Sequence, residues 1–349
     1  MNITYLLGAG ASANALPVVK DIPERLIKFQ NYIEENFPED IDEKKKLCIN
    51  IKSLLKTLAN HTTIDTYAKE LSHLNRTIDL LRLKSVLSVY FLWEQIQNGI
   101  DKRYNSFLTK VLTNNNRIPE NIKILTWNYD IQLEMAMNVY TNAEYIIMDY
   151  RFSLDPYIEQ FSIVAKSLCS FPCHHMDIEN HDLYKIEFIR LNGIAGSSLY
   201  TNPTFGTLGL NNPPLLPINM SLERKKLFTK EILRKYESLK QNTFFNFAWE
   251  KENEISKKAV KKAIEISQQT EILVVIGYSF PDFNWEIDKS ILGEMKRLKR
   301  VYVQDINPDG IADVLKDFFS SGEGIDINPD IEIVVKSINT VNEFHIPRT

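Results

Sequence analysis

The sequence predicts an α/β protein in which a doubly wound parallel sheet carries a helical insertion after its first strand. Three observations lead to this prediction. The chain opens on an apolar run that meets a glycine-rich turn at Gly8 and Gly10. Its C-terminal third alternates Val/Ile-rich runs with helical patterns, which is typical of strands covered by helices on both faces. Between these parts, residues 21–120 show helical spacing of apolar residues. Together these patterns indicate a Rossmann-like sheet.

Composition is that of an ordinary globular protein. The 349 residues are 44% hydrophobic and 25% charged, and a chain of this length can form one large domain over 1–349. The net charge of -4 gives no global basic field, so direct nucleic-acid binding is not expected. No apolar run approaches about 18 residues, and the N-terminus lacks the pattern of a secretory signal. We therefore expect a cytoplasmic protein without membrane contact.

The opening segment is interpreted as a buried strand that feeds a loop. Gly8, Gly10 and Ala13 give the pattern Gly-x-Gly-x-x-Ala, in which free N–H groups and the N-terminus of a following helix would face a phosphate. A glycine turn with no ligand is the alternative. The absence of Lys-Ser/Thr argues against a nucleotide-triphosphate loop. The candidate pyrophosphate-binding residues are Gly8, Ala9, Gly10, Ala11 and Ser12.

Helices dominate residues 21–120. A helix start is predicted at Asp21 and Ile22, with Pro23 in the first turn. Helical spacing covers 23–36, 43–58, 64–74, 78–97 and 103–112, and no strand is expected before 122–126. An ordinary dinucleotide-binding unit returns to a second strand within about thirty residues and places an acid at its end. The sequence therefore predicts a helical insertion over 21–120 and disfavours an ordinary NAD-linked oxidoreductase.

A second insertion of loops and helices is predicted over residues 145–250. A strand is expected over 184–191, a loop-rich stretch over 201–217, and helices over 222–239 and 249–267. Lysine pairs at 225–226, 257–258 and 261–262 fit solvated helix faces, with a basic groove for a partner as the alternative. The C-terminal third predicts strands over 271–276, 300–304 and 331–335, with helices over 285–298 and 309–319.

The three cysteines favour neither a metal centre nor a disulfide framework. Cys48, Cys169 and Cys173 include no Cys-x-x-Cys pair and cannot supply four thiolates. Cys169 and Cys173 lie beside His174 and His175, so a metal cluster is an alternative at this segment. One thiolate pair without a second ligand pair more often reflects buried thiols and surface imidazoles. No metal is therefore expected.

Polar or glycine residues follow nearly every predicted strand. In open parallel sheets, ligands bind beyond the carboxyl ends of the strands. Each of these residues alone has a structural explanation as a turn or a helix cap, but their joint placement favours a ligand site. Besides the opening loop, the candidate residues are Asn128, Asp130, Asn192, Gly277, Ser279, Asp305 and Asn307.

These strand ends are similar to those of a known family. The chain resembles the sirtuin-like domain of bacterial anti-phage NAD hydrolases over almost its whole length, in Gly8-Ala9-Gly10-Ala11-Ser12, Thr126-Trp127-Asn128-Tyr129-Asp130, Gly277-Tyr278-Ser279-Phe280 and Asp305-Ile306-Asn307. The resemblance implies an NAD-binding fold in which the glycine loop holds the pyrophosphate. It also implies that Asn128 lies at the nicotinamide ribose, and that Gly277, Ser279 and Asp305 lie near the adenosine half.

The chain departs from this family at two points. Sirtuin deacylases carry a four-cysteine zinc module, which this chain cannot build, so protein deacylation is disfavoured. Asn192-Gly193 stands where family members usually have His-Gly, and that histidine is considered the general base. An amide cannot take a proton near neutral pH, and the loss of a positioned base costs about 10²–10⁴ in rate. His174, His175 or His181 is an alternative source of the imidazole.

Two hypotheses of function follow. The first is an NAD hydrolase that forms nicotinamide and ADP-ribose and acts as an NAD-depleting defence effector. Asn128, Asp130 and Asn192 would then hold the ribose, position water and stabilise positive charge. The resemblance implies control by homo-oligomerisation, or by a partner such as a P-loop ATPase or a short Argonaute. The second hypothesis, favoured by Asn192, is a non-catalytic subunit that binds NAD or ADP-ribose as a sensor or scaffold.

Overall fold

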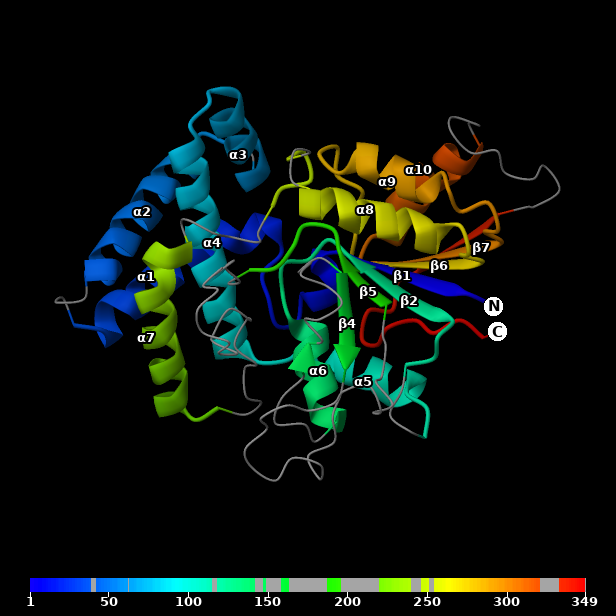
Figure 1. Ribbon diagram of the computed structural model, residues 1–349, viewed down its shortest axis with the longest axis horizontal. Helices are drawn as coiled ribbons and strands as arrows, with labels where there is room; N and C mark the ends of the chain where they lie inside the picture. The colour runs from blue at the N-terminus through cyan, green and yellow to red at the C-terminus, as the bar shows by residue number, and fades with distance from the viewer. Residues whose placement is uncertain are drawn as a thin grey trace.

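The fold is an eight-stranded sheet covered by helices, beside a separate layer of helices (Figure 1). The computed structural model describes residues 1–38, 42–61, 63–114, 118–141, 147–148, 158–162, 187–195, 220–239, 246–250, 254–320 and 333–348. The sheet order is β3-β4-β5-β2-β1-β6-β7-β8. The strands are β1 Ile3–Leu7, β2 Ile122–Thr126, β3 Ile147–Met148, β4 Ile158–Ser162, β5 Glu187–Arg190, β6 Ile272–Ile276, β7 Arg300–Gln304 and β8 Val334–Ile338.

Six of these strands are parallel, and their order is that of a doubly wound sheet. Numbered along the chain, the parallel strands β5, β2, β1, β6, β7 and β8 run 3-2-1-4-5-6, so the order reverses between β1 and β6. The predicted fold class is therefore confirmed. The strands β4 and β3 extend the β5 edge in antiparallel pairing, which the sequence did not indicate.

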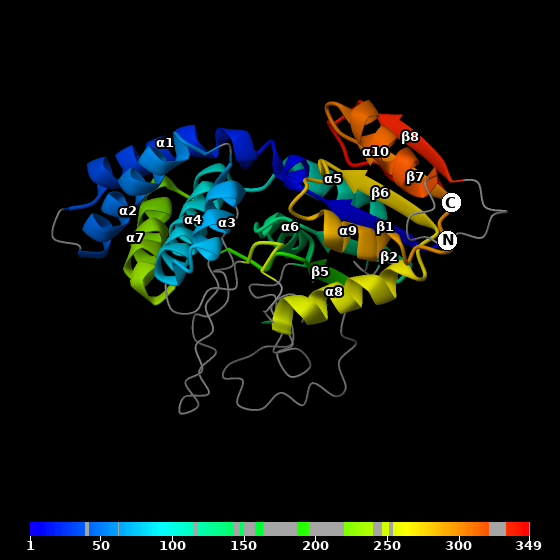
Figure 2. The ribbon, with the colours of Figure 1, turned by 90° about the horizontal axis from the view of Figure 1, so that it is seen from above.

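Helices cover both faces of the sheet. Figure 2 shows the remaining helices gathered beside it, where α1, α2, α3, α4 and α7 form what we call the helical bundle. The helices are α1 Ile22–Asn36, α2 Asp42–Leu58, α3 Ile64–His73, α4 Thr77–Asn98, α5 Lys102–Val111, α6 Gln132–Thr141, α7 Leu222–Leu239, α8 Glu254–Ser267, α9 Trp285–Leu292 and α10 Pro308–Ser320.

The alternation of side chains along β1 divides the core in two. Tyr5 and Leu7 pack with α5 and α6 on one face, whereas Leu6 belongs to the larger cluster that includes α8, α9 and α10. This period of two is the direct consequence of strand geometry. Both faces of the strand are therefore buried, as the near-continuous apolar run predicted.

The helical insertion begins where the sequence indicates, and its members divide between two places. Helix α1 starts at Ile22 with Pro23 in its first turn. Helix α4 is buried on nearly all sides from Leu83 to Ile96, so it forms the centre of the helical bundle. Helix α5 instead packs against the sheet, and α7, from the second predicted insertion, packs on α4 and α2. Tertiary contact thus joins helices from both insertions.

Three observed elements begin or end at other residues than the sequence predicted. The helix expected over 249–267 begins at Glu254, and residues 246–250 precede it as a non-helical segment. The helix expected over 285–298 ends at Leu292, because the chain turns at Gly293. The strand expected over 331–335 is β8, Val334–Ile338, whose pairing with β7 sets its register. Residues 201–217 and 184–186 lie outside the described residues.

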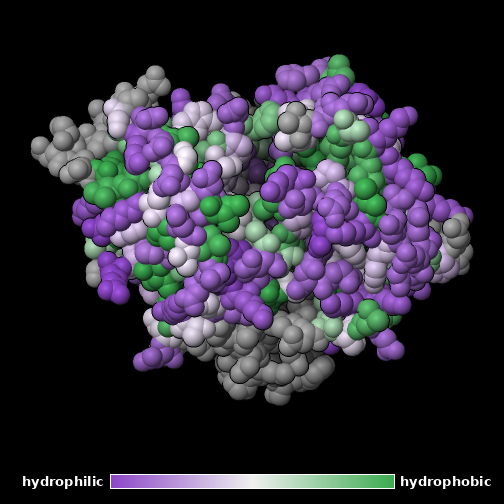
Figure 3. Space-filling view, turned by 180° about the vertical axis from the view of Figure 1, so that it is seen from behind, coloured by the Kyte–Doolittle hydropathy of each residue, from purple (hydrophilic) through white to green (hydrophobic). Residues whose placement is uncertain are grey.

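The helices and the surface of the described residues can be compared with what a membrane-spanning segment requires. None of the helices there is long and apolar enough to cross a membrane. In Figure 3, hydrophilic side chains cover most of the visible face, and the hydrophobic groups lie between them in separate areas. The largest exposed apolar side chains include Ile49 and Leu227 on the helical bundle and Ile306 after β7.

Two glycine turns contact each other at the point where the strand order reverses. The N–H of Gly8 donates to Ile276 O at 3.0 Å, and the N–H of Gly10 donates to Gly277 O at 2.9 Å. A Cβ on Gly277 would lie 2.3 Å from backbone atoms of Gly10 and 2.4 Å from Ala11 N. Gly277 also has φ +60°, in the left-handed region. These turns can approach so closely only because side chains are absent.

We expect Gly277→Ala to lower the free energy of unfolding by at least about 3 kcal/mol, because overpacking and left-handed strain add. Chemical denaturation measures this change. The matched control is Gly310→Ala in α10, where an added Cβ meets no atom within 4 Å. This helical position should instead be stabilised by up to about 1 kcal/mol. Equal stability of Gly277→Ala and the parent would contradict the prediction.

Candidate functional site

The predicted site residues come together because the parallel strands end in register. Leu7 of β1 pairs with Thr126 of β2 and with Ile276 of β6. Thr126 pairs in turn with Arg190 of β5, and Ile276 pairs with Gln304 of β7. Five strands therefore end at one edge of the sheet. The segments that follow them carry every site residue that the sequence singled out.

The glycine loop does not lead directly into an α-helix, contrary to the expectation from the sequence. A short 3₁₀ turn, Ala9–Ser12, follows β1, and the first α-helix begins only at Ile22. The N–H groups of Gly8 and Gly10 donate to the turn at Gly277, and the N–H of Ala11 donates to Gly8 O within its own turn. The N–H of Ala9 donates to no described residue, and Ala9 is partly exposed. The difference arises because the two glycine turns pack against each other, and this contact satisfies the N–H groups of Gly8 and Gly10.

A buried arginine holds the other side of the glycine loop. Arg103, at the start of α5, donates through Nη2 to Gly10 O and to Ala11 O, both at 3.1 Å. Its guanidinium also pairs with Asp101 at 2.6 Å, and Asp101 accepts from the N–H of Asn14 at 3.1 Å. The loop is thus held by hydrogen bonds at carbonyl and N–H groups alike. Sequence reasoning missed Arg103, because the loop carbonyls to which it donates lie about ninety residues away in the chain.

Asn128 follows β2 and faces the glycine loop. Its Nδ2 donates to Gly8 O at 2.9 Å and lies 3.5 Å from Ser12 Oγ. Its own N–H donates to Thr126 Oγ1 at 3.0 Å, which fixes the turn after the strand. The Oδ1 atom accepts no hydrogen bond from a described residue. Asn128 therefore binds the loop with its donor and keeps an acceptor for another group.

Asn192 follows β5 and contacts the segment that carries Asn128. Its Nδ2 lies 3.4 Å from Trp127 O and 3.3 Å from Tyr129 Oη, both at the long end of the hydrogen-bond range. Its Oδ1 is buried without a hydrogen-bond partner among the described residues. An unpartnered buried acceptor is costly, by about 1–3 kcal/mol. The structure therefore brings Asn128 and Asn192 to neighbouring positions with an acceptor left open on each.

Asp130 is enclosed by protein donors. Its Oδ2 accepts from Ser12 Oγ at 2.7 Å, and its Oδ1 accepts from the N–H of Gln132 at 3.1 Å, at the start of α6. Tyr104 Oη lies 3.0 Å from the same serine oxygen. Burial raises the pKa of Asp130, and the hydrogen bond from Ser12 opposes this rise. The geometry is that of a helix cap that also ties the glycine loop to α6.

A buried ion pair supports this corner of the sheet. Arg190, the last residue of β5, forms an ion pair with Glu134 of α6 and donates through Nη1 to Asp130 O at 2.7 Å. The guanidinium lies over the ring of Phe188. Burial lowers the pKa of Arg190 to about 10, against the opposing effect of Asp130. Sequence reasoning missed this pair, because an arginine that ends an apolar strand gives no sign of its partner.

A buried carboxylate links the ends of β2 and β6. Asp288 of α9 accepts from Trp127 Nε1 at 3.0 Å and from Tyr278 Oη at 2.6 Å. The rings of Trp127 and Tyr278 stack with centroids 6.0 Å apart, and Asn284 donates to Tyr278 Oη at 2.9 Å. One signal in the sequence could have revealed this group, namely an acid within the predicted helix that follows the Gly277-Tyr278 turn. These contacts orient the aromatic side chains next to Asn128.

The remaining predicted residues lie on the exposed side of the edge. Ser279 is exposed after Gly277, and Asn307 is exposed after β7. Asp305 is half-buried, and its Oδ1 accepts from the N–H of Asn307 at 2.9 Å. Its second oxygen accepts from no described residue. The structure therefore places these residues at the same edge as the glycine loop, with Asp305 able to accept from a further donor.

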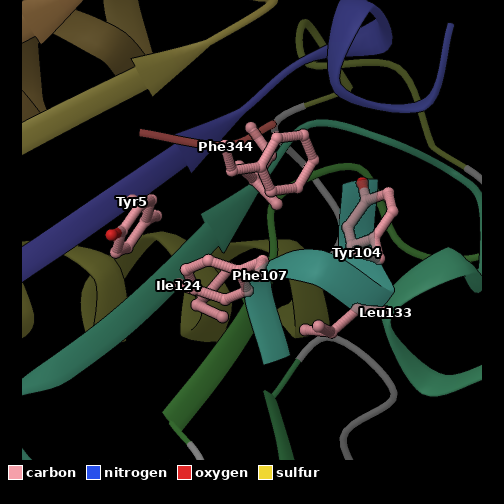
Figure 4. A pocket seen from close by; sticks show the side chains of 7 residues that line it. Tyr5, Tyr104, Phe107, Ile124, Leu133 and Phe344 are labelled. Carbon is pink, nitrogen blue, oxygen red and sulfur yellow. The ribbon is translucent and has the colours of Figure 1, made fainter. Parts of the chain in front are cut away.

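The enclosed space seen in Figure 4 is not the candidate site. Its walls come from β1, β2, α5, α6 and the C-terminal segment, and the space between them does not admit a water molecule. It is a gap in the apolar core below the glycine loop, lined by Tyr5, Leu7, Tyr104, Phe107, Ile124, Leu133 and Phe344. The candidate site is thus defined by the strand ends.

No group of three or more His, Cys, Asp or Glu side chains within the described ranges is arranged to hold a metal ion. Cys48 is a buried free thiol. The alternative metal cluster of Cys169, Cys173, His174 and His175 lies outside the described residues, as does His181.

The fold is that of a Rossmann-like α/β protein, and the candidate site residues lie at the carboxyl edge of its sheet. No protein-family model and no curated protein matches the chain.

Asp288 should make stability depend on pH. Burial raises the pKa of Asp288 from 3.8 to about 7, and the hydrogen bonds from Tyr278 and Trp127 oppose this rise. The native state thus holds the proton more tightly than the unfolded chain does. Its contribution to stability is full below about pH 4, falls as the pH rises to about 7, and is absent above. We expect Asp288→Asn to reduce the change in the free energy of unfolding between these two pH values.

Urea denaturation over this pH range, at constant ionic strength, measures the effect. The matched control is Asp309→Asn, which removes an exposed carboxylate from the first turn of α10. This variant should keep the slope of the parent. If Asp288→Asn and the parent lose stability in parallel as the pH rises, Asp288 is not the titrating group.

Proposed function

We propose that the protein is an NAD hydrolase, which converts NAD and water to nicotinamide, ADP-ribose and a proton. One observation carries this proposal. Asn192 lies beside the segment of Asn128, and its buried Oδ1 accepts no hydrogen bond from any described residue. A ribose hydroxyl would supply the missing donor. The doubly wound order, with its polar residues at the carboxyl edge, supports a nucleotide as the ligand.

The same edge offers contacts for each part of NAD. Asn128 and Asn192 would accept from the hydroxyls of the nicotinamide ribose. The pyrophosphate would lie along Gly8 to Ser12, where the N–H of Ala9 has no described acceptor. Asp305 would accept from the adenosine ribose, beside Gly277, Ser279 and Asn307.

The chemistry asks little of the protein. The bond between ribose C1′ and the pyridinium nitrogen breaks, and its electron pair returns to nitrogen, so neutral nicotinamide leaves without a general acid. Water adds to the oxocarbenium-like carbon and loses its proton. The protein must hold the ribose and position the water, which two fixed amides can do. Asp130 would contribute indirectly by fixing the turn after β2, because both its oxygens already accept hydrogen bonds from protein groups.

A non-catalytic NAD or ADP-ribose sensor is the second candidate. One observation favours it: two buried carboxylates beside the Asn128 segment, those of Asp130 and Asp288, each accept two hydrogen bonds from protein groups. Asp130 accepts from Ser12 and Gln132, and Asp288 accepts from Trp127 and Tyr278. Neither is placed as a free base for water. Binding without turnover is the direct consequence if hydrolysis requires one.

We also propose, on the family resemblance, that the protein depletes NAD in defence against phage. A hydrolase of this kind has to be inactive until needed, so we propose control by homo-oligomerisation or by a partner protein such as a P-loop ATPase or a short Argonaute. The helical bundle offers exposed apolar side chains, among them Ile49 and Leu227, for such contacts.

Release of nicotinamide from NAD, measured by chromatography, tests the proposal. We expect Asn128→Ala to lower the rate by about 10²-fold, because the ribose loses an acceptor and the glycine loop loses a donor. The matched control is Asn121→Ala, which removes a half-buried asparagine at the opposite end of β2, where its Nδ2 donates to Met1 O. It should keep the parental rate. No release above buffer, either alone or in the assembled complex, would contradict the function.

Asn192→His separates the two candidates. If the protein is a hydrolase limited by the lack of a base, an imidazole at this position should raise kcat by about 10²–10⁴ near neutral pH. Nicotinamide release and calorimetric binding of NAD are measured on the same samples. Binding of NAD with no turnover in either protein would establish the sensor and exclude the hydrolase.

A further inference from the structure

One face of α4 lies against both segments that carry the site asparagines. Lys84, Phe91 and Gln95 are spaced at i, i+7 and i+11, so they share a face of the helix. Gln95 accepts from the N–H of Ile131 through Oε1 at 2.7 Å. Phe91 packs on the ring of Tyr129 at 5.8 Å between centroids. The central helix of the bundle therefore touches the Asn128 segment at two places.

Lys84 reaches the Asn192 segment through one intermediate residue. Its Nζ donates to Asn246 Oδ1 at 3.0 Å. The N–H of Asn246 donates to Asn192 O at 3.0 Å, and its Nδ2 donates to Ser256 Oγ of α8 at 3.2 Å. Asn246 is thus a buried junction between α4, α8 and the end of β5. It holds the backbone of Asn192, whose side chain has only the two long contacts described above.

A buried ion pair fixes this junction. Lys84 Nζ lies 2.6 Å from Glu250 Oε1, and Glu250 Oε2 accepts from the N–H of Phe247 at 2.7 Å. Both side chains are largely buried. Burial lowers the pKa of Lys84, and Glu250 opposes this change. Buried ion pairs contribute little net stability compared with apolar packing, but they fix geometry where their hydrogen bonds are satisfied. Here the fixed geometry is that of residues 246–250.

We propose that Lys84 is a positioning residue, which acts through Asn246 to hold Asn192 at the reacting end of the site. This inference rests on the proposed function for its effect on turnover, but the contacts that carry it do not depend on NAD. Its consequence is that the helical bundle, an insertion remote from the sheet core, sets the geometry of the site. A protein that binds and displaces the bundle would change the position of Asn192 by the same route.

The first test compares two lysines that both anchor the bundle. Lys84→Met removes the cation and its hydrogen bonds but keeps a side chain of similar length. Lys225→Met is the matched control, because Lys225 of α7 donates to Gln97 O of α4 at 2.6 Å but does not contact residues 246–250. We expect Lys84→Met to lower kcat for NAD by at least about tenfold with little change in KM, since misplacement by about 1 Å can cost about 10²-fold. Lys225→Met should keep both constants.

A double-mutant cycle tests the route. Asn246→Ala should lower kcat about as much as Lys84→Met, and the combined variant should lose no more than either, because both changes break the same connection. Independent, additive losses would overturn the role of Asn246. If Lys84→Met does not fold, Lys84→Met with Glu250→Gln removes both charges together and takes its place.

A second measurement keeps this inference separate from the proposed function. The side-chain amide of Asn192 is followed by NMR in protein labelled with ¹⁵N-asparagine, and its signals are identified by their loss in Asn192→Asp. We expect these signals to shift in Lys84→Met and to stay in place in Lys225→Met. Unchanged Asn192 signals in folded Lys84→Met overturn the inference. Shifted signals in a protein that releases no nicotinamide support it while refuting hydrolysis.

Discussion

The contact between the two glycine turns is the constraint on which the candidate site depends. β1 and β6 are the strands between which the order reverses, where the following loops of a doubly wound sheet ordinarily separate. Here Gly8 and Gly10 bond to Ile276 and Gly277, and the backbones approach to distances that no side chain permits. A short 3₁₀ turn, not an α-helix, therefore follows β1, and most N–H groups of the loop donate hydrogen bonds to protein carbonyls. The other strand ends are then arranged around a fixed, buried turn.

Buried polar groups connect the surrounding elements to that turn. Arg103 holds the loop carbonyls, Asp130 ties Ser12 to α6, and Asp288 ties the aromatic side chains after β2 and β6 to α9. Groups of this kind are costly to bury unless each finds a partner. Most of them do, which rigidifies the strand ends before any ligand arrives. Asn192 Oδ1 has no hydrogen-bond partner among the described residues, and it lies at the edge of the sheet where a ligand is expected.

The helical bundle gives a physical reason for the insertion between the first two parallel strands. A simple crossover would need only one helix to return the chain to the sheet. The chain instead builds α1 to α4 and adds α7 from a distant segment, so that α4 is buried on nearly all sides. The face of α4 that carries Lys84 and Gln95 contacts the segments of Asn192 and Asn128. An insertion that touches two sides of the candidate site is well placed to control it.

The sequence by itself determined the parallel strands, most helix boundaries and the residues at the strand ends, because period, apolar runs and turn residues are local properties. It predicted Asn128 and Asn192 as candidate site residues. Tertiary structure alone decided their surroundings. The role of Gly277 follows from contact with Gly10, more than 260 residues away, and the partners of Arg190, Asp288 and Lys84 lie on other elements. Local patterns cannot report such contacts, since the long-range pairing of strands and helices brings these groups together only when the chain folds.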